Sequence, residues 1–272
     1  MGCVNDIFFP RAALAAARVL EHLGVEVDVP QAQTCCGQAH YNSGYPHQAR
    51  RLARHFLHAF GRADCIVGVS PSCTAMVREG YGPLLRASPL LAEQAEGVAG
   101  RLYEFSEFIV RRLGQVQLGA RFPARAVYHT SCHALRLLHL AEPPLRLLQA
   151  VEGLELVALP GAERCCGFGG TFAVKSPEVS VAMADDKLDS ILATGAELVV
   201  SGDTSCLLHL MGRAHRRQLG LRFAHLAEVL AEGLGLMRHR RGVASAPQAG
   251  MPAGRSRDGD RGGRPVAGGV AM

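Results

Sequence analysis

Cysteine is the residue of this sequence whose number and spacing could do chemistry. Eight of the nine cysteines fall into two sets of four, each made of a single cysteine, a vicinal pair followed by glycine, and a last single cysteine. Four thiolates are a ligand set of structural zinc and of iron–sulfur clusters. The spacing therefore predicts two metal sites. Their ligands would be Cys3, Cys35, Cys36 and Cys73 in the first, and Cys132, Cys165, Cys166 and Cys206 in the second.

The arrangement within each set favours iron–sulfur clusters over zinc. Structural zinc usually takes thiolates in close pairs such as C-x2-C, and neither set contains such a pair. Adjacent cysteines do not converge easily on one ion, whereas they can reach different iron atoms of a larger cluster. Gly37 and Gly167 follow the vicinal pairs, and a positive φ there would let backbone N–H groups approach the cluster sulfurs. A zinc-stabilised binding scaffold stays open as an alternative.

Two further residues are candidates for the surroundings of the second cluster. His133 directly follows a predicted ligand, and Lys175 lies a few residues beyond the second vicinal pair. We expect both to lie around the cluster rather than on its metal, where they would help to balance its negative charge. Cys65 has no counterpart in the other half, and we expect it to be a thiol of the core. The sequence assigns no catalytic residue.

The segments that surround the cysteines repeat as well. Glu107 and Glu228 occupy matching places in the last helix expected in each half. A repeat this long indicates two copies of one fold unit. The matching segments are residues 24–30 and 153–160, the Ser-Cys pairs at 72–73 and 205–206, and the closing helices expected at 101–113 and 222–234.

Within each unit the periodicity alternates between helix and strand. Residues 10–23 and 47–61 carry apolar side chains at helical spacing, whereas residues 25–29 and 65–69 are short β-rich runs. In the second half, residues 125–130 form a strand pattern that leads to the next cysteine. This alternation predicts an α/β fold with parallel sheets, whose functional groups sit beyond the carboxyl ends of the strands.

The repeat also predicts the boundaries of the modules. We expect a tail without regular structure, because its Gly- and Arg-rich composition has no period. Only two residues precede Cys3, whereas a strand precedes Cys132, so we expect a further strand upstream of the sequence given. The predicted parts are a first module over residues 1–114, a linker over 115–124, a second module over 125–237 and the tail over 238–272.

The composition describes a folded chain and weighs against two classes of partner. Apolar residues make up 48%, yet no stretch approaches the roughly 18 uncharged apolar residues of a membrane span. The seven Arg and two Asp from residue 238 onward account for the whole net charge of +5, so no basic face for nucleic acid is expected. No secretory signal is recognised. We expect a cytoplasmic protein, whose clustered cysteines bind metal rather than form disulfides.

These motifs resemble a known family, the tandem cysteine-rich CCG-domain proteins, and most of all its lactate utilization protein A (LutA/YkgE) branch. The likeness covers about residues 3–235. The ferredoxin-like segments of some longer relatives are absent from this sequence, which favours the short branch. The segments that carry the likeness are Cys3–Pro10, Cys35–Gly44, Val127–His133, Cys165–Lys175 and His225–Leu230.

The resemblance implies both a structure and a function. It implies two Rossmann-like cysteine-rich modules related by pseudo-twofold symmetry, each holding one [4Fe–4S] cluster with its four cysteines. It further implies an electron-transfer subunit of a complex that oxidises L-lactate to pyruvate. The partners implied are a LutB-like iron–sulfur protein and a LutC-like protein, so the chain would be a subunit of an oxidoreductase rather than an enzyme on its own.

Relatives in the wider family keep other functions open. One alternative is a thiol–disulfide redox subunit like that of heterodisulfide reductase, and another is an iron–sulfur subunit of the glycolate oxidase type. The heterodisulfide reductase pattern ends each module in C-x-x-C, whereas Ser70 and Asp203 stand at the first of those positions here. This departure favours an ordinary four-cysteine cluster in each module.

Overall fold

The computed structural model describes residues 3–238, and the tail expected from residue 238 onward lies outside them apart from its first residue. We call residues 3–112 the first module and residues 121–233 the second module. Segments labelled η are π-helical. The first module contains α1 (Cys3–Phe8), α2 (Pro10–His22), α3 (Gln38–Asn42), α4 (Pro46–Phe60), β1 (Ile66–Gly68), α5 (Pro71–Ala75), η1 (Met76–Gly80), α6 (Tyr81–Leu85), α7 (Pro89–Ala99), β2 (Leu102–Glu104), α8 (Phe105–Glu107) and η2 (Phe108–Arg112).

The second module repeats the alternation of helix and strand. Its four strands form one parallel sheet in the order β4-β3-β5-β6, so the expected α/β class with parallel sheets is confirmed. Strand β3 begins four residues earlier than expected, within the segment expected as a linker. The elements are β3 (Arg121–Tyr128), η3 (His133–Leu137), α9 (Glu142–Gln149), β4 (Glu152–Val157), α10 (Thr171–Lys175), α11 (Pro177–Leu192), β5 (Leu198–Ser201), α12 (Thr204–Arg216), β6 (Arg222–His225) and α13 (Leu226–Gly233).

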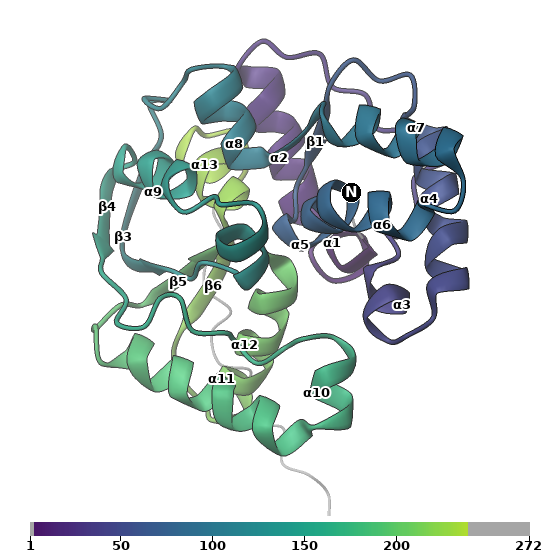
Figure 1. Cartoon of the computed structure of the whole chain (residues 1–272). Helices are drawn as coiled ribbons and strands as arrows, with labels where there is room; N and C mark the ends of the chain where they lie inside the picture. Colours follow the sequence, from purple (N-terminus) through teal and green to yellow (C-terminus); the bar gives the residue numbers. More distant parts are fainter. Residues whose placement is uncertain (1–2, 239–272) are drawn as a thin grey trace, which may run out of the picture. The chain divides into compact units, whose positions relative to one another are not determined.

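Helices cover both faces of the second sheet (Figure 1). Along β5, Val199 packs into a cluster with α11 and α12, whereas its neighbours Leu198 and Val200 pack into a cluster with α9 and α13. This alternation follows from the two-residue period of a strand. All three side chains are buried, as expected for a parallel sheet covered on both sides.

The first module has a smaller sheet than its sequence predicts. Strands β1 and β2 pair in parallel, as their counterparts β5 and β6 do. The strand expected at residues 25–29 is wrong, because these residues form no ladder. Their counterpart β4 pairs only with β3, and no strand corresponding to β3 exists among the described residues of the first module. Without such a neighbour the backbone of 25–29 has nothing to pair with.

The two closing helices also differ from expectation at their starts. Residues 102–104 and 222–225 are strands β2 and β6, and the helices begin only after them. In both modules a capping box marks the change from strand to helix. The side chain of the N-cap residue accepts hydrogen bonds from backbone N–H groups in the first turn of the helix. A glutamate three residues later accepts the backbone N–H of the N-cap residue. The N-caps are Glu104 and His225, and the glutamates are Glu107 and Glu228.

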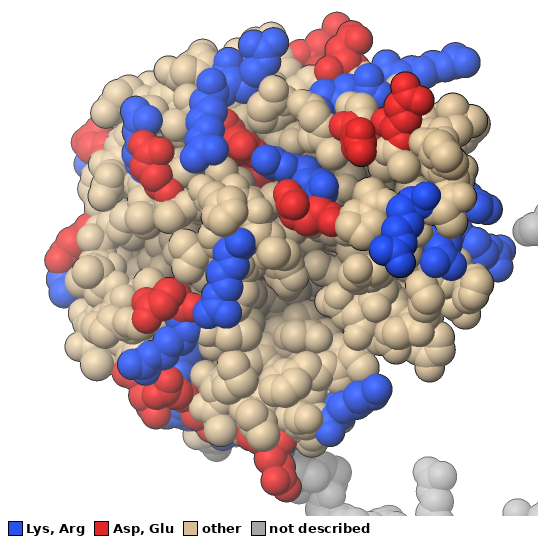
Figure 2. All heavy atoms as spheres, in the orientation of Figure 1, with Lys and Arg blue, Asp and Glu red and all other residues tan. Residues whose placement is uncertain are grey.

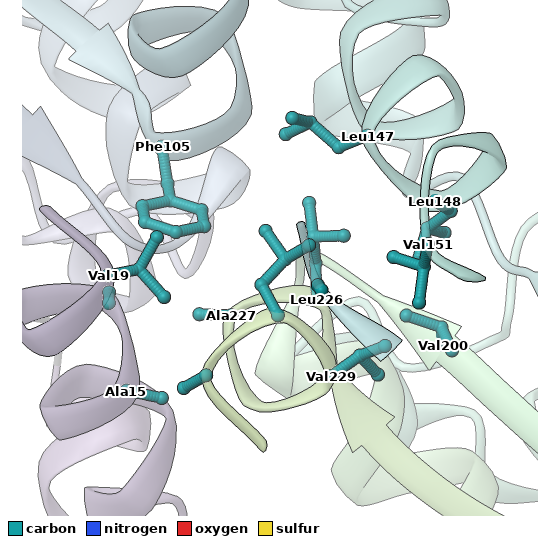
Figure 3. Close-up of a cluster of buried hydrophobic side chains, with 14 of the residues drawn as sticks. Ala15, Val19, Phe105, Leu147, Leu148, Val151, Val200, Leu226, Ala227 and Val229 are labelled. Carbon is teal, nitrogen blue, oxygen red and sulfur yellow. The ribbon is translucent and has the colours of Figure 1, made fainter. Parts of the chain in front are cut away.

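One hydrophobic cluster joins the two modules (Figure 3). Helix α2 of the first module packs against α13, which ends the second, and α8 of the first packs against α9 of the second. Figure 3 shows Ala15 and Val19 of α2 facing Ala227 of α13, with Phe105 of α8 beside them. Each module therefore uses its first long helix and its closing helix to bury apolar surface against the other.

The surface carries charges of both signs. On the face drawn in Figure 2, basic and acidic side chains are interspersed. Several are paired, as in the bidentate contact between Arg213 and Asp185, whose N–O distances are 2.8 and 2.7 Å. Within residues 3–238, no helix has the length and apolar character needed to cross a membrane.

Candidate metal centres

The four cysteines of the first set come together from three separate segments. Cys3 opens α1, the vicinal pair lies in the turn before α3, and Cys73 lies in α5 just past the end of β1. The sulfurs of Cys3 and Cys35 are 3.6 Å apart. Further thiol hydrogen bonds link Cys36 to Cys35 and to Cys73. The set therefore forms one continuous group of thiols at the carboxyl end of the sheet.

The second set has the same arrangement. Cys132 follows β3, the vicinal pair follows β4, and Cys206 lies in α12 after β5. Thiol hydrogen bonds link Cys165 to Cys132 and Cys166 to both Cys165 and Cys206. Cys166 and Cys206 are buried, whereas the other two are half-buried. The exposed Cys65 belongs to neither group, and burial of part of its surface raises the pKa of its thiol.

Hydrogen bonds favour the thiolate form of the first cysteine of each vicinal pair and, in the first set, of Cys73 as well. The bond from Cys3 is the main cause that holds the pKa of Cys35 well below its usual range, and the bond from Cys132 does the same for Cys165. Backbone N–H groups add to this effect: Gly37 donates to Cys35 Sγ at 3.4 Å, and Gly167 donates to Cys165 Sγ at 3.3 Å. Because the thiolate is the form that binds metal, each set holds a ligand ready for it.

The Cys-Cys-Gly turns depend on the backbone conformation of their glycines. Gly37 has φ +86° and Gly167 has φ +90°, as the sequence predicts for these two positions. The turn aims the glycine N–H back at the first sulfur of the pair, and glycine can take up the left-handed conformation that the chain needs there without a steric cost. Different contacts hold the two turns: Tyr81 donates to the Cys36 carbonyl at 2.9 Å, and Ser180 donates to the Gly167 carbonyl at 2.7 Å.

Two residues that sequence reasoning missed lie beside the second set. His129, just past β3, is fully buried, and burial lowers the pKa of its ring to about 4, so the imidazole is neutral at neutral pH. Lys187 of α11 is also buried, and its ammonium donates to the Gly161 carbonyl at 2.6 Å. The cation expected from the sequence, Lys175, is instead exposed at the end of α10.

A sequence signal for both residues exists. His129 stands between the end of a strand and a cysteine, which is where functional groups of parallel sheets gather. Lys187 interrupts a stripe of buried residues at helical spacing on α11, formed with Ala184, Leu188 and Ile191. A charged residue in such a stripe indicates a buried partner, which here is a backbone carbonyl before the vicinal pair.

The elements that carry the two sets pack against each other. Helix α1, which begins at Cys3, contacts α12, which carries Cys206, and α5, which carries Cys73, contacts η3, which follows Cys132. His133 lies in this contact, 3.0 Å from the Gln38 amide nitrogen of the other module. The contacts are reciprocal. In each module, the helix at the first cysteine packs against the helix that carries the last cysteine of the other module.

The N-caps of the closing helices cross the same interface. His225 Nδ1 accepts the Ala227 N–H, so Nε2 is the donor, and it lies 2.8 Å from the Gly202 carbonyl and 3.1 Å from the Val69 carbonyl of the first module. Its counterpart Glu104 lies near Gly202 of the second module. Burial raises the pKa of Glu104 to about 7. Two titratable groups are thus buried where the two modules meet.

A cavity reaches the first set from solvent. It has a volume of about 260 Å³ and is lined by Cys3 and Cys35 together with Asp6, Ile7 and residues from 29 to 34. Its walls come from α1 and from the irregular segment before the vicinal pair. The first set is therefore the more open of the two, which agrees with the exposure of Cys3.

The donors fit an iron–sulfur group. Each set supplies four sulfurs from segments distant in sequence, one of them as a thiolate with a backbone N–H aimed at it. Donated N–H bonds of this kind offset the negative charge of cluster-bound sulfur and shift its reduction potential. The arrangement can hold a metal group and adjust its electron affinity.

Comparisons with known proteins place both sets of cysteines within a cysteine-rich domain. The family model of the CCG cysteine-rich domain matches residues 1–78 and 126–211. The chain is 46% identical over 234 residues to lactate utilization protein A of an Exiguobacterium species (strain AT1b), covering 85% of this chain and 95% of that protein. The identity is 45% with the protein of the same name from Geobacillus thermodenitrificans, covering 84% and 95%. It is 43% with lactate utilization protein A 1 of Bacillus mycoides, covering 85% and 94%.

Proposed function

The chain belongs to the cysteine-rich CCG family that includes lactate utilization protein A, and on this premise we propose that it is the iron–sulfur electron-transfer subunit of a complex that oxidises L-lactate to pyruvate. One observation carries the proposal: two equivalent groups of four thiols lie in one chain, and the helices at their first and last cysteines pack against each other. When bound, an iron–sulfur cluster exchanges single electrons at a potential that its surroundings adjust.

Two sites in one chain suit the chemistry of a 2-hydroxy acid. Oxidation of L-lactate to pyruvate releases two electrons and two protons, and two one-electron centres can together take up both electrons. The eight cysteines are assigned as the ligands, four for one [4Fe–4S] cluster in each module. The N–H groups of Gly37 and Gly167 tune the clusters, and the contacts around Asp203 and His133 hold the two sites close together.

The remaining parts of the reaction are assigned to partner subunits. The proposed partners are a LutB-like iron–sulfur protein and a LutC-like protein, in keeping with the names of the relatives, which speak of lactate utilization. Exchange of electrons with the iron–sulfur partner is assigned to the side of the first set, because Cys3 and Cys35 line a cavity that opens there. A cluster that lies close to the protein surface favours fast electron transfer to a partner protein.

Anaerobic purification followed by elemental analysis tests the cofactor. Iron and acid-labile sulfide in both modules, with a reducible visible spectrum and an EPR signal, would support the proposal. Zinc without sulfide would replace it with the binding scaffold. The matched control is Cys65→Ser, which removes the thiol that belongs to neither set and should leave the iron content unchanged.

Reduction by substrate tests the assignment to lactate. The chain mixed with its two partner proteins should be reduced by L-lactate, whereas the chain alone should not be. Growth of a deletion strain on L-lactate as carbon source gives the physiological counterpart, with glycolate as a second substrate. Loss of growth on glycolate alone would move the assignment to the glycolate oxidase type.

A further inference from the structure

His129 lies beside the second set, and neither of its polar side-chain atoms has a use in the fold described so far. Its side chain is fully buried, and neither Nδ1 nor Nε2 has a hydrogen-bond partner. Leaving a buried polar group unsatisfied costs about 1–3 kcal/mol. An imidazole in this position therefore needs a partner, and the protein atoms around it do not supply one.

The neighbours of His129 indicate what that partner is. A ring nitrogen of His129 and the sulfurs of Cys166 and Cys206 all lie within 4.8 Å of one another, and all three residues are buried. Metal–nitrogen bonds of about 2.0–2.1 Å and metal–sulfur bonds of about 2.3 Å would let atoms at this spacing bind one metal group together. Among the described residues, no comparable trio with a histidine surrounds the first set.

We infer that His129 supplies a nitrogen ligand to the metal of the second site, beside the sulfurs of Cys166 and Cys206 and in place of one of the two half-buried thiolates of that set. The inference rests on the proposed iron–sulfur function and goes beyond it, because it makes the two sites chemically different. The position of His129 supports it: the residue follows β3, one of the two central strands of its sheet, and so lies at the same edge of the sheet as the other ligands.

A histidine ligand has a direct consequence for electron flow. Replacing thiolate by imidazole ligation at iron raises the reduction potential of an iron–sulfur centre, because imidazole is neutral and thiolate carries a charge. The buried ammonium of Lys187 near the second vicinal pair acts in the same direction. The second site should therefore have the higher potential, and electrons that enter at the open first site should move on to the second.

Pulsed EPR on the reduced, cluster-loaded protein tests the ligand. Protein grown with ¹⁴N-histidine should show a strong nitrogen coupling that changes to the ¹⁵N pattern when ¹⁵N-histidine is supplied. The coupling should disappear in His129→Leu and in Cys166→Ala, and should persist in His133→Gln, a matched control for a histidine beside the same site. The isotope exchange in the unaltered protein gives a result even where His129→Leu does not fold.

The outcomes separate this inference from the proposed function. Iron and sulfide in both sites without any strong histidine coupling would overturn the histidine ligand and leave the iron–sulfur function intact. A coupling that survives in His129→Leu would assign the nitrogen to another residue and overturn the inference as well. Absence of iron and sulfide from the purified and reconstituted protein would overturn both.

Discussion

The Asp203 carboxylate accepts a hydrogen bond of 3.1 Å from the backbone N–H of Ser72, a residue of the other module. Ser72 directly precedes Cys73, and Asp203 caps α12, whose third residue is Cys206, by accepting the Ser205 N–H at 3.1 Å. One buried carboxylate therefore fixes the starts of the two helices that carry the last cysteine of each set. The two proposed metal sites are joined through a single side chain.

Removal of this carboxylate should weaken both sites. For Asp203→Ala we expect the free energy of unfolding to fall by about 1–3 kcal/mol, because a helix cap and a buried N–H partner are lost together. Asp203→Asn keeps one acceptor oxygen and should lose less. Chemical denaturation of the metal-free protein measures the loss of stability. Iron content after reconstitution measures the weakening of the two metal sites. Equal stability of the alanine variant and the unaltered protein would contradict the role described.

Loss of a ligand in one module should leave the other module loaded. Cys166→Ala removes a buried sulfur that contacts two other thiols of the second set, so we expect about half the iron and sulfide to be lost. Cys65→Ala is the matched control, because that thiol touches neither set. Elemental analysis decides the matter: iron unchanged in Cys166→Ala would remove the second set from the proposed ligands.

Much of the architecture could be predicted because the two halves repeat each other. Glu107 and Glu228, matched by their positions alone, turn out to perform the same task, since each accepts the N–H of the N-cap residue three positions before it. Helices α2 and α4 lie within a residue or two of their predicted limits, because their apolar spacing and their first-turn prolines are local properties.

The rest depends on contacts between distant segments. Residues 25–29 have the composition of a strand, yet strand formation needs a neighbour, and composition carries no information about it. Comparison with the family pattern identifies Asp203 only as the loss of a cysteine, although a carboxylate where the first half has Ser70 breaks the repeat and so indicates a role that the two halves do not share. The use of His129 depends on its burial beside two sulfurs that lie more than 35 residues away.

The buried carboxyl of Glu104 should make the stability depend on pH. Burial raises its pKa to about 7, above its ordinary value of 4.5, so between these values the folded state holds a proton that the unfolded state has lost. On account of this residue, the free energy of unfolding falls as the pH rises from about 4.5 to about 7, by an amount on the order of 3 kcal/mol. His129, whose pKa is lowered to about 4, acts in the opposite direction over a similar range.

Comparison of Glu104→Gln with the unaltered protein isolates this contribution. The amide stays neutral at every pH and can still accept the Ser106 and Glu107 N–H bonds that Glu104 accepts at 2.8 and 3.2 Å. We expect the two proteins to be nearly equal in stability at pH 4 and the variant to be more stable at pH 8. Glu96→Gln, at an exposed position of α7, should follow the unaltered protein at both pH values. A stability difference that does not change with pH would contradict the assignment.

The two Cys-Cys-Gly turns should respond differently to the same substitution. Alanine at Gly37 or Gly167 would carry the cost of a left-handed backbone, roughly 1–2 kcal/mol in each case. At Gly37 the added methyl would meet its nearest atoms at 3.4 Å, which is ordinary contact, whereas at Gly167 it would lie 2.5 Å from the Ser180 carbonyl oxygen. Gly167→Ala must therefore push the turn away from α11.

We expect Gly167→Ala to be the more destabilising change and to lower the iron content of the second site, with Gly37→Ala affecting the first site less. Gly44→Ala has a similar positive φ of +82° with no atom within 4 Å of the added methyl, so it measures strain without collision. Thermal unfolding and iron analysis of the three variants give the order, and a Gly37→Ala protein that loses as much iron as Gly167→Ala would show that strain alone governs these turns.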